Sequence, residues 1–361
     1  MKKVAVIGIC LEQLKGRHGL SALEASGHNF GNMLFTNAAY DQIKNCSHIG
    51  FSFNPEKINA NYDAILIPAA NWINTTQDWG GLGELIKKTN LPVTIMGLGA
   101  QLDSLSDYKR IPKGTKNFLT TISDLCHSIG VRGEFTASVL KKLGIKNVDV
   151  LGCPSIFSNG KLPEIRMNGL NRIKRIGVGP TRYNIPEITS SNMYDKQRLL
   201  YQFALNNANS LYFQSEAFEI SILNRDETSD LSKAVKYYGT NSEIELIDSI
   251  MVKGKYHTHL DQWISDVMKE DIFIGTRIHG VIAATLAGTP AILITHDKRT
   301  EELAEAMAVP SISINDFRIE SLLSMNDFVS CFDFEKFSRR TETNFKRFKQ
   351  FYAKNNLPSN F

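Results

Sequence analysis

The chain has 361 residues, of which 42% are hydrophobic and 22% are charged, and its formal net charge at pH 7 is +4. This composition excludes intrinsic disorder, and the near balance of charge excludes the strong basicity of a protein that coats nucleic acid. The length suffices for two domains of about 150 residues each, since a single hydrophobic core rarely grows much larger.

The N-terminal residues and the cysteines indicate the cellular compartment in which we expect the protein. The apolar run at residues 4–9 is too short for a signal peptide, and no small-residue cleavage site follows it. No window approaches the roughly 20 apolar residues of a membrane-spanning helix. The five cysteines are odd in number and far apart, which argues against a disulfide framework or a zinc site. We therefore expect a soluble, cytoplasmic protein without a bound metal.

Short apolar runs alternate with helical patterns in the first half of the chain. Strands buried on both faces are predicted at residues 4–9, 64–68, 93–97, 129–131 and 148–151. Residues 134–143 carry apolar side chains at helical spacing, and Gly144 follows where a helix-ending glycine belongs. This alternation predicts a parallel sheet flanked by helices.

A polar, irregular stretch after Ser155 separates this series from a second one. It contains Asn159-Gly160, Asn168-Gly169 and the basic residues 172–175, and we place the domain boundary there. New strands are predicted at residues 176–179, 210–213, 272–275 and 291–295. The sequence therefore predicts an α/β protein in which two doubly wound, Rossmann-like domains face each other across a cleft.

The expected domains span residues 1–160 and 170–315, and a helical segment follows at residues 316–361. Aromatic residues between Phe334 and Tyr352 are spaced for one helical face, and the basic residues lie mostly elsewhere. Packing of this helix across the domain junction is the first interpretation. The second is peripheral contact with an anionic surface, such as the inner face of the membrane, because basic amphipathic helices also bind there.

The strongest candidate site follows the predicted strand 272–275. Arg277 and His279 come directly after it, at the start of a helix rich in small residues. Such a helix N-terminus attracts anions through free backbone N–H groups and the helix dipole. Arg277 adds a planar pair of donors for phosphate or carboxylate, and His279 adds a proton donor. The alternative, a capping arginine and a satisfied interior histidine, is less favoured because two buried polar groups would need partners.

Arg132 has a similar position in the first half of the chain. It follows the predicted strand 129–131 and precedes the helix 134–143, so it is a second candidate for binding an anion. Pairing with Glu134, or capping of this junction, explains the pattern equally well.

Several segments resemble the polysaccharide pyruvyl transferase family. The most specific is Thr276-Arg277-Ile278-His279, within residues 275–290. The supporting segments are His28-Asn29-Phe30-Gly31-Asn32, Met96-Gly97-Leu98-Gly99-Ala100-Gln101, Val131-Arg132-Gly133-Glu134 and Gly152-Cys153-Pro154-Ser155. The resemblance covers residues 4–310.

This resemblance implies the two-domain fold of GT-B glycosyltransferases and transfer of a pyruvyl group from phosphoenolpyruvate to a saccharide, such as an exopolysaccharide or cell-surface glycan precursor. It places Arg277 and His279 at the donor as the catalytic residues. Forming a pyruvate ketal requires protonation of the enol carbon, and His279 is the expected general acid. Because arginines can hold the phosphate and carboxylate of the donor, neither a metal nor another cofactor is expected. The expected donor-binding residues are Arg132, Gly275, Thr276, Arg277 and Gly280.

The acceptor is expected to be a saccharide, free or lipid-linked, and its ligands are harder to name. Amides and carboxylates bind sugar hydroxyls well, although each candidate is equally explained as a turn or cap residue. The candidates near predicted strand ends are Asn29, Asn32, Asn71, Gln101, Gln214, Glu216, Asp297 and Arg299.

Two other functions fit the same residues. A GT-B glycosyltransferase would use Arg277 and His279 to hold the diphosphate of a nucleotide sugar, since a fold does not fix a chemistry. A non-catalytic relative would bind glycan without releasing phosphate. No nucleic-acid partner is expected, and the sugar, its linkage and the oligomeric state lie beyond what the sequence predicts.

Overall fold

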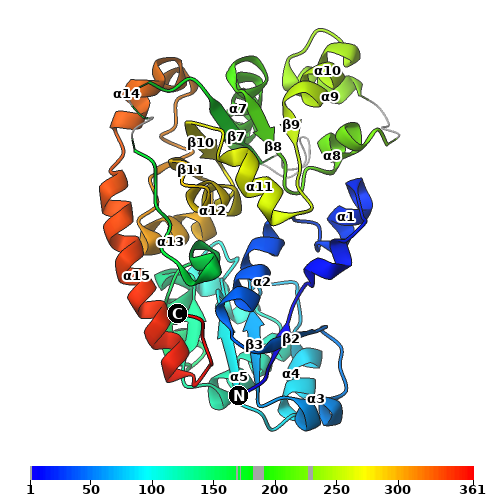
Figure 1. The fold of residues 1–361 in the computed structure, drawn as a ribbon, viewed down its shortest axis with the longest axis vertical. Helices are drawn as coiled ribbons and strands as arrows, with labels where there is room; N and C mark the ends of the chain where they lie inside the picture. Colours follow the sequence, from blue (N-terminus) through cyan, green and yellow to red (C-terminus); the bar gives the residue numbers. More distant parts are fainter. Residues whose placement is uncertain (1, 168–169, 171, 182–190, 227–230) are drawn as a thin grey trace.

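The structure, a computed structural model, describes residues 2–167, 170, 172–181, 191–226 and 231–361. Two parallel sheets flanked by helices lie one above the other along the long axis of the molecule (Figure 1). The predicted α/β fold of two Rossmann-like halves is confirmed. Asn168-Gly169, part of the predicted boundary, lies outside the described residues, and the division at 160 and 170 stays a prediction.

The first sheet has the strand order β2-β1-β3-β4, with every neighbouring pair parallel. A parallel pair, β5 and β6, extends it beyond β4 through a bridge between Leu98 and Val131. The strands are β1 Val4–Ile7, β2 Cys46–Ile49, β3 Ala64–Pro68, β4 Val93–Met96, β5 Ile129–Val131 and β6 Val148–Val150. The helices of this part of the chain are η1 Leu11–Leu14, α1 Gly19–Ala25, α2 Gly31–Gln42, α3 Pro55–Asn61, α4 Gly80–Lys87, η2 Leu105–Arg110, α5 Lys113–Leu125, α6 Glu134–Lys142 and η3 Pro154–Gly160.

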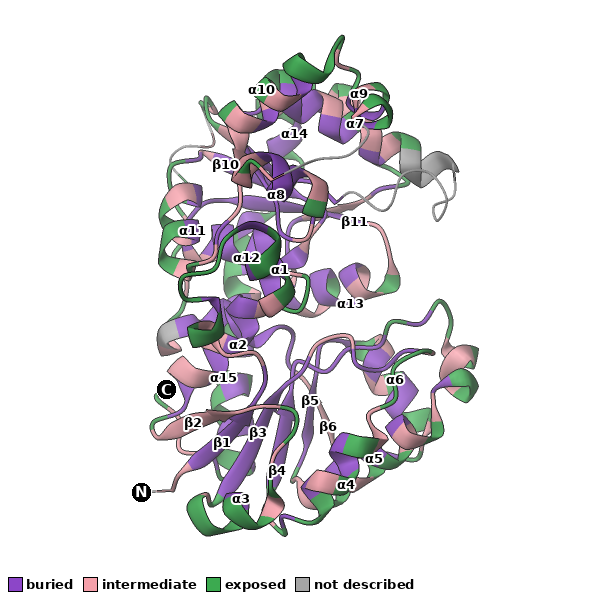
Figure 2. Cartoon of the chain, turned by 90° about the vertical axis from the view of Figure 1, so that its right-hand side faces the viewer, coloured by how far each residue is buried: buried purple, intermediate pink, exposed green. Residues whose placement is uncertain are grey.

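The second sheet has the order β12-β11-β10-β7-β8-β9 and is also parallel throughout. Its strands are β7 Ile176–Gly179, β8 Ser210–Tyr212, β9 Gly254–Lys255, β10 Ile272–Gly275, β11 Ala291–Thr295 and β12 Ser311–Ser313. The helices are α7 Ser191–Asn207, α8 Ala217–Asn224, α9 Ser232–Tyr238, α10 Glu243–Lys253, α11 Leu260–Val267, α12 Ile278–Leu286, α13 Lys298–Met307, η4 Ile319–Ser324, α14 Met325–Ser330 and α15 Phe334–Lys354. Figure 2 shows the central strands of both sheets in the colour of buried residues.

All of the predicted strands are present, and one differs in its burial. β6 is only partly buried, and not buried on both faces as predicted, because it forms the outer edge of its sheet. The strands β2, β9 and β12 were not predicted. They are short, partly exposed and contain polar residues, so they lack the apolar pattern of a central strand.

Two helical segments join the halves. The α1 segment comes from the start of the chain yet packs on the second half, where Gly19 N–H donates to Tyr256 Oη at 3.0 Å. At the other end of the chain, α15 runs down one side of the molecule (Figure 1). Its Tyr352 hydroxyl donates to Gln42 Oε1 at 2.6 Å in the first half, and Asn344 donates to the carbonyl of Ala306 in α13 at 3.0 Å.

The aromatic face of α15 is covered by the rest of the protein. Phe334, Phe337, Phe348 and Tyr352 are buried, and the Phe348 ring meets Phe157 edge-on at 5.0 Å. Burial of this face favours the first interpretation of the helix, packing within the fold, because the apolar stripe is not available to a membrane. Among the described residues, no helix combines the length and apolar character needed to cross a membrane.

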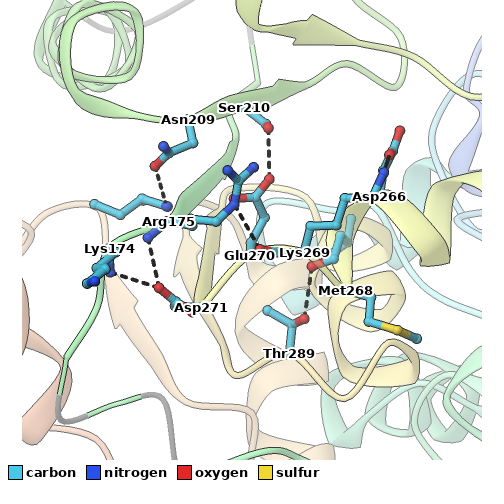
Figure 3. A network of polar contacts seen from close by, with 12 residues as sticks. Lys174, Arg175, Asn209, Ser210, Asp266, Met268, Lys269, Glu270, Asp271 and Thr289 are labelled. Carbon is cyan, nitrogen blue, oxygen red and sulfur yellow. Dashed lines mark hydrogen bonds and ion pairs between the residues drawn. The ribbon is translucent and has the colours of Figure 1, made fainter.

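A polar network fixes the amino ends of β7 and β10 (Figure 3). The Asp271 carboxylate accepts hydrogen bonds from the backbone N–H groups of Lys174 and Arg175, at 2.8 and 2.9 Å. Glu270 accepts a hydrogen bond from Ser210 Oγ at 2.8 Å. The other Glu270 oxygen lies 3.7 Å from Arg175 Nε as an ion pair. These contacts hold the amino ends of the strands together, and the opposite, carboxyl edge of the sheet is the usual place for a ligand.

Candidate active site

A cavity opens at the carboxyl ends of the second sheet, where β7 and β10 lie side by side. The strand order reverses there, because β8 lies on one side of β7, whereas β10 and β11 lie on the other side. Such a reversal is the usual ligand position in open α/β sheets. The cavity holds about 500 Å³ of empty space. Both halves of the chain contribute to its lining, which consists of Asn29, Asn71, Arg132, Thr181, Gln214, Thr276, Arg277, Ile278, His279, His296, Arg299, Thr300 and Leu303.

Small residues shape the end of β10. Thr276 Oγ1 donates to Thr181 Oγ1 at 2.8 Å, which ties the end of β10 to the segment after β7. A Cβ atom at Gly275 would lie 2.8 Å from the Phe273 ring, and one at Gly280 would lie 3.0 Å from it. Glycine at these two positions makes room for that ring. Thr276 lines the cavity, whereas Gly275 and Gly280 do not, so the structure gives the two glycines a packing role.

Arg277 stands at the N-cap of α12 and is held by the loop after β8. Its Nε and Nη2 donate to Glu216 Oε1 at 3.1 and 2.7 Å, and Nη2 also contacts Ser215 Oγ. The other Glu216 oxygen accepts from the backbone N–H groups of Gln214 and Ser215 at 2.8 and 2.9 Å. Burial favours a raised pKa for Glu216, but Arg277 and these N–H groups outweigh it and lower the pKa. Glu216, predicted to bind acceptor, therefore acts here as the partner that orients Arg277.

Arg132 is buried without a carboxylate partner. Its Nε donates to the carbonyl of Gly97 at 2.8 Å, and its Nη1 donates to Asn71 Oδ1 at 2.8 Å. Its Nη2 has no hydrogen-bond partner in the described part of the chain, and no described carboxylate forms an ion pair with it. Burial lowers the pKa of this guanidinium. Pairing with Glu134, the alternative from the sequence, is not what the structure shows.

His279, the second helical residue of α12, packs against the first half. A Cβ atom at Gly31 would lie 2.5 Å from His279 Nδ1, so the glycine at the start of α2 allows the imidazole to approach. The Phe35 ring lies 5.7 Å from the imidazole, centre to centre. Burial, with smaller effects from Arg132 and then Arg277, lowers the pKa of His279 to about 3. Burial is therefore the main cause of the lowered pKa, and the unliganded imidazole is neutral.

Three buried polar groups without protein partners meet in this one cavity. Besides Arg132 Nη2, they are His279 Nε2 and both side-chain amide atoms of Gln214, as judged within the described residues. Buried polar groups are nearly always hydrogen-bonded, so their gathering in one place indicates that a ligand completes them. As predicted, Arg132 and Arg277 face the same cavity.

The segment after β11 places another arginine at the cavity. Arg299 lines it and is held by Asp297 Oδ2, to which its Nε donates at 2.8 Å. Asp297 is the N-cap of α13, where its Oδ1 accepts from the Thr300 N–H at 2.9 Å. Burial favours a raised pKa for Asp297, but the adjacent His296 and Arg299 outweigh it and lower the pKa. Asp297 does not line the cavity, so its contacts are those of a cap and of a partner for Arg299.

The predicted acceptor residues are divided between two cavities. Gln214 lines the cavity already described, whereas Asn32 and Gln101 line a second one beside the first sheet. Asn29 and Asn71 line both. The binding roles assigned to these residues from the sequence stay predictions.

Several residues of the cavities were not predicted. His296 and Thr181 line the first cavity, and each follows the end of a strand, which is the signal that could have found them. Glu302 was also missed: from α13 it accepts hydrogen bonds from the N–H and hydroxyl of Thr136, at 3.0 and 2.8 Å, and so joins the second half to the N-terminus of α6. Burial raises the pKa of this carboxyl. Nothing in its helical sequence pattern distinguishes Glu302 from a surface residue.

In the described ranges, no group of three or more His, Cys, Asp or Glu side chains is arranged to hold a metal ion. All five cysteines are free.

The fold and cavity define an α/β protein of two Rossmann-like halves, with an arginine-lined cavity at the carboxyl ends of its second sheet. The family model for polysaccharide pyruvyl transferase matches residues 24–298. The chain therefore belongs to the polysaccharide pyruvyl transferase family. A search of curated proteins found no match.

The search of solved structures found matches at low identity over most of the chain. One is a UDP-GlcNAc 2-epimerase from Neisseria meningitidis bound to UDP-GlcNAc, with 11% identity, a TM-score of 0.49, and coverage of 98% of this chain and 100% of that chain. Another is a UDP-forming α,α-trehalose-phosphate synthase from Burkholderia vietnamiensis, with 9% identity, a TM-score of 0.41, and coverage of 97% and 94%.

Proposed function

We propose that the protein transfers a pyruvyl group from phosphoenolpyruvate to two hydroxyls of a saccharide, forming a pyruvate ketal and releasing phosphate. The observation that carries the proposal is Arg132, whose buried guanidinium has an unpartnered Nη2 in the same cavity as Arg277 and His279. A buried cation without a counter-charge is unfavourable, so the cavity suits an anionic ligand. Phosphoenolpyruvate carries a phosphate and a carboxylate, which two separate guanidinium groups can bind.

The roles of the two arginines follow from their partners. Arg277 forms an ion pair with Glu216 at 2.7 Å, which neutralises part of its positive charge and fixes the orientation of its guanidinium group. Its main contribution to donor binding is therefore the direction of its hydrogen bonds. Arg132 has no ion-pair partner among the described residues and is positioned by neutral oxygens of Gly97 and Asn71. We therefore assign the greater share of the donor's negative charge to Arg132, with Arg299 and the N-terminus of α12 as further positive groups.

His279 is the proposed general acid. It gives a proton to the methylene carbon of phosphoenolpyruvate while a sugar hydroxyl attacks the adjacent carbon, and it recovers a proton from that hydroxyl. The carbon–oxygen bond to phosphate then breaks, and a second hydroxyl attacks the same carbon to close the ketal. The proton of the second hydroxyl leaves with the phosphate, so the transfer needs no other reactant. The positive groups around the phosphate stabilise it as it leaves.

The donor must change the protonation of His279 for this to work. Without a ligand, burial and the two arginines hold its pKa at about 3, so the imidazole carries no acidic proton near neutral pH. The phosphate group brings two negative charges close to the imidazole and offsets the arginines, which raises the pKa. The acid is thus expected to form only when the donor is bound.

The test is phosphate release from phosphoenolpyruvate across a panel of saccharides, followed by mass measurement of the product. The expected product is heavier than the acceptor by one pyruvate minus one water. A melting-temperature comparison should show stabilisation by phosphoenolpyruvate. Stabilisation by nucleotide sugars alone, with transfer of a sugar, would refute the proposal and favour the glycosyltransferase alternative.

A further inference from the structure

The second cavity lies at the point where the strand order of the first sheet reverses. The strand β2 lies on one side of β1, whereas β3 and β4 lie on the other side. The cavity is lined by Gly8, which follows β1, and by Pro68 and Ala70 at the end of β3. This is the ligand position of an open α/β sheet. It holds about 860 Å³ of empty space. In the view of Figure 2, the strands of this sheet run from the lower end of the molecule toward the second half.

The chemistry of this cavity contrasts with that of the cationic one. No charged side chain lines it within the described residues. Three aromatic rings that contact one another line it: Trp72 and Trp79 are stacked with centroids 4.1 Å apart, and the Phe51 ring lies 6.1 Å from Trp79. Trp79 is fixed further by its Nε1, which donates to the carbonyl of Trp72 at 3.1 Å. Phe51 is 41% exposed, which is unusual for a large aromatic side chain and leaves its ring available to a ligand.

Amide side chains also line this cavity, and two of them, Asn29 and Asn71, line the cationic cavity as well. Asn71 uses its Oδ1 to hold Arg132, and Asn29 uses its Oδ1 to accept from the Gly31 N–H at 2.9 Å. Neither Nδ2 group has an acceptor among the described residues, so two amide donors remain where the cavities meet. Gln101 lines the same cavity with an exposed side chain.

We propose that this cavity binds an uncharged sugar ring of the acceptor, with its C–H face against Phe51 and Trp79 and its hydroxyls on Asn29 and Asn71. Aromatic faces offer apolar contact to the C–H side of a pyranose, and amides offer neutral hydrogen bonds to its hydroxyls. The two asparagines on the shared wall would point the reacting hydroxyls toward the donor between Arg132 and Arg277. A phosphate or carboxylate on this sugar would find no cation here.

This inference rests on the proposed function, and its test separates the two. Tryptophan fluorescence, titrated with methyl glycosides of glucose, galactose and mannose and with N-acetylglucosamine, reports saccharide binding without phosphoenolpyruvate. Trp72 and Trp79 line the cavity, and the third tryptophan, Trp263, is buried in the second half. Pyruvyl transfer to the same saccharides gives the KM for the acceptor and kcat.

Phe51→Ala is the main variant, because its exposed side chain is not needed for the core. It should raise the acceptor KM or saccharide Kd by about 3- to 10-fold, the size expected for one aromatic contact, and leave phosphoenolpyruvate affinity unchanged. Phe53→Ala is the matched control, since Phe53 is on the same loop but packs on the core and does not line the cavity. Trp79→Leu should act like Phe51→Ala, and Trp79→Phe should preserve binding.

The outcomes are distinct. Transfer with an unchanged acceptor KM in Phe51→Ala and Trp79→Leu would overturn the sugar subsite and leave the proposed function intact. Saccharide quenching that Phe51→Ala weakens, without any phosphate release, would support the subsite and refute the proposed function. Quenching by uridine or UDP in place of the saccharides would overturn the subsite as well.

Discussion

Replacing His279 with glutamine should make the free energy of unfolding less sensitive to acid. The pKa of His279 is about 3 in the folded protein, and the usual value of about 6.5 applies in the unfolded chain. Above pH 6.5 the imidazole is neutral in both states. As the pH falls from 6.5 toward 3, only the unfolded chain takes up a proton, so stability is lost across that window. Between pH 7 and pH 5 this single group accounts for about 2 kcal/mol.

Urea unfolding followed by circular dichroism measures this effect at pH 7 and pH 5. The buffers should contain no phosphate, sulfate or phosphoenolpyruvate, because an anion beside Arg132 would raise the pKa of His279. The wild type should lose about 2 kcal/mol more than His279→Gln between the two pH values, whatever the variant costs at pH 7. His127→Gln, at an exposed histidine, controls for the substitution itself. Equal losses in the wild type and His279→Gln would refute the assignment of a buried, neutral imidazole.

Four further predictions concern catalysis, the donor and the contact between the halves. His279→Ala should lower turnover by about 10²- to 10⁴-fold and change phosphoenolpyruvate affinity much less, as measured by steady-state kinetics and calorimetry; near-normal turnover would contradict the general-acid role. Binding of phosphoenolpyruvate near neutral pH should be accompanied by proton uptake, because the donor raises the pKa of His279 from about 3. Calorimetry in buffers of different ionisation enthalpy measures the number of protons exchanged, and proton release would contradict this prediction. Arg132→Ala should weaken phosphoenolpyruvate binding by about 10- to 100-fold, and Arg132→Lys should not restore it, because one ammonium cannot replace both Nη donors; full affinity in the lysine variant would contradict the planar pairing. Glu302→Ala should destabilise the protein by about 1–3 kcal/mol in urea unfolding, since the Thr136 N–H and hydroxyl lose their acceptor; no change would show that the contact between α13 and α6 is not stabilising.

The fold was largely readable from the sequence because central parallel strands are buried on both faces. The runs Ala64–Pro68 and Ala291–Thr295 are buried along their whole length and are apolar except for Thr295, so their pattern favours a central strand. Ser311–Ser313 at the sheet edge has polar residues on either side of one apolar residue, and its pairing depends on β11 more than on its own composition. The packing of the α1 segment on the second half could not be predicted from the sequence either, because it depends on tertiary contacts such as that of Gly19 with Tyr256.

The sequence predicted those residues of the candidate site that directly follow the end of a strand. Arg132, Arg277 and His279 were found this way, since the carboxyl ends of parallel strands converge on one edge. The pairing of Arg277 with Glu216 was not, because the two are far apart in sequence and Glu216 looked like any strand-end carboxylate. The aromatic cavity was missed for a similar reason: Trp72 and Trp79 flank a loop, and only the fold brings Phe51 beside them.

The site depends on the contact between the two halves, and this has a chemical consequence. Arg132 comes from the first half and His279 from the second, yet Arg132 is the largest electrostatic influence on the imidazole after burial. The imidazole itself is buried partly by Gly31 and Phe35 of the first half. Moving the halves apart would remove both effects and return the pKa of His279 toward its usual value. In the proposed mechanism, the contact between the halves would therefore keep the imidazole neutral until an anion enters, and protonation of His279 would be coupled to the presence of the donor.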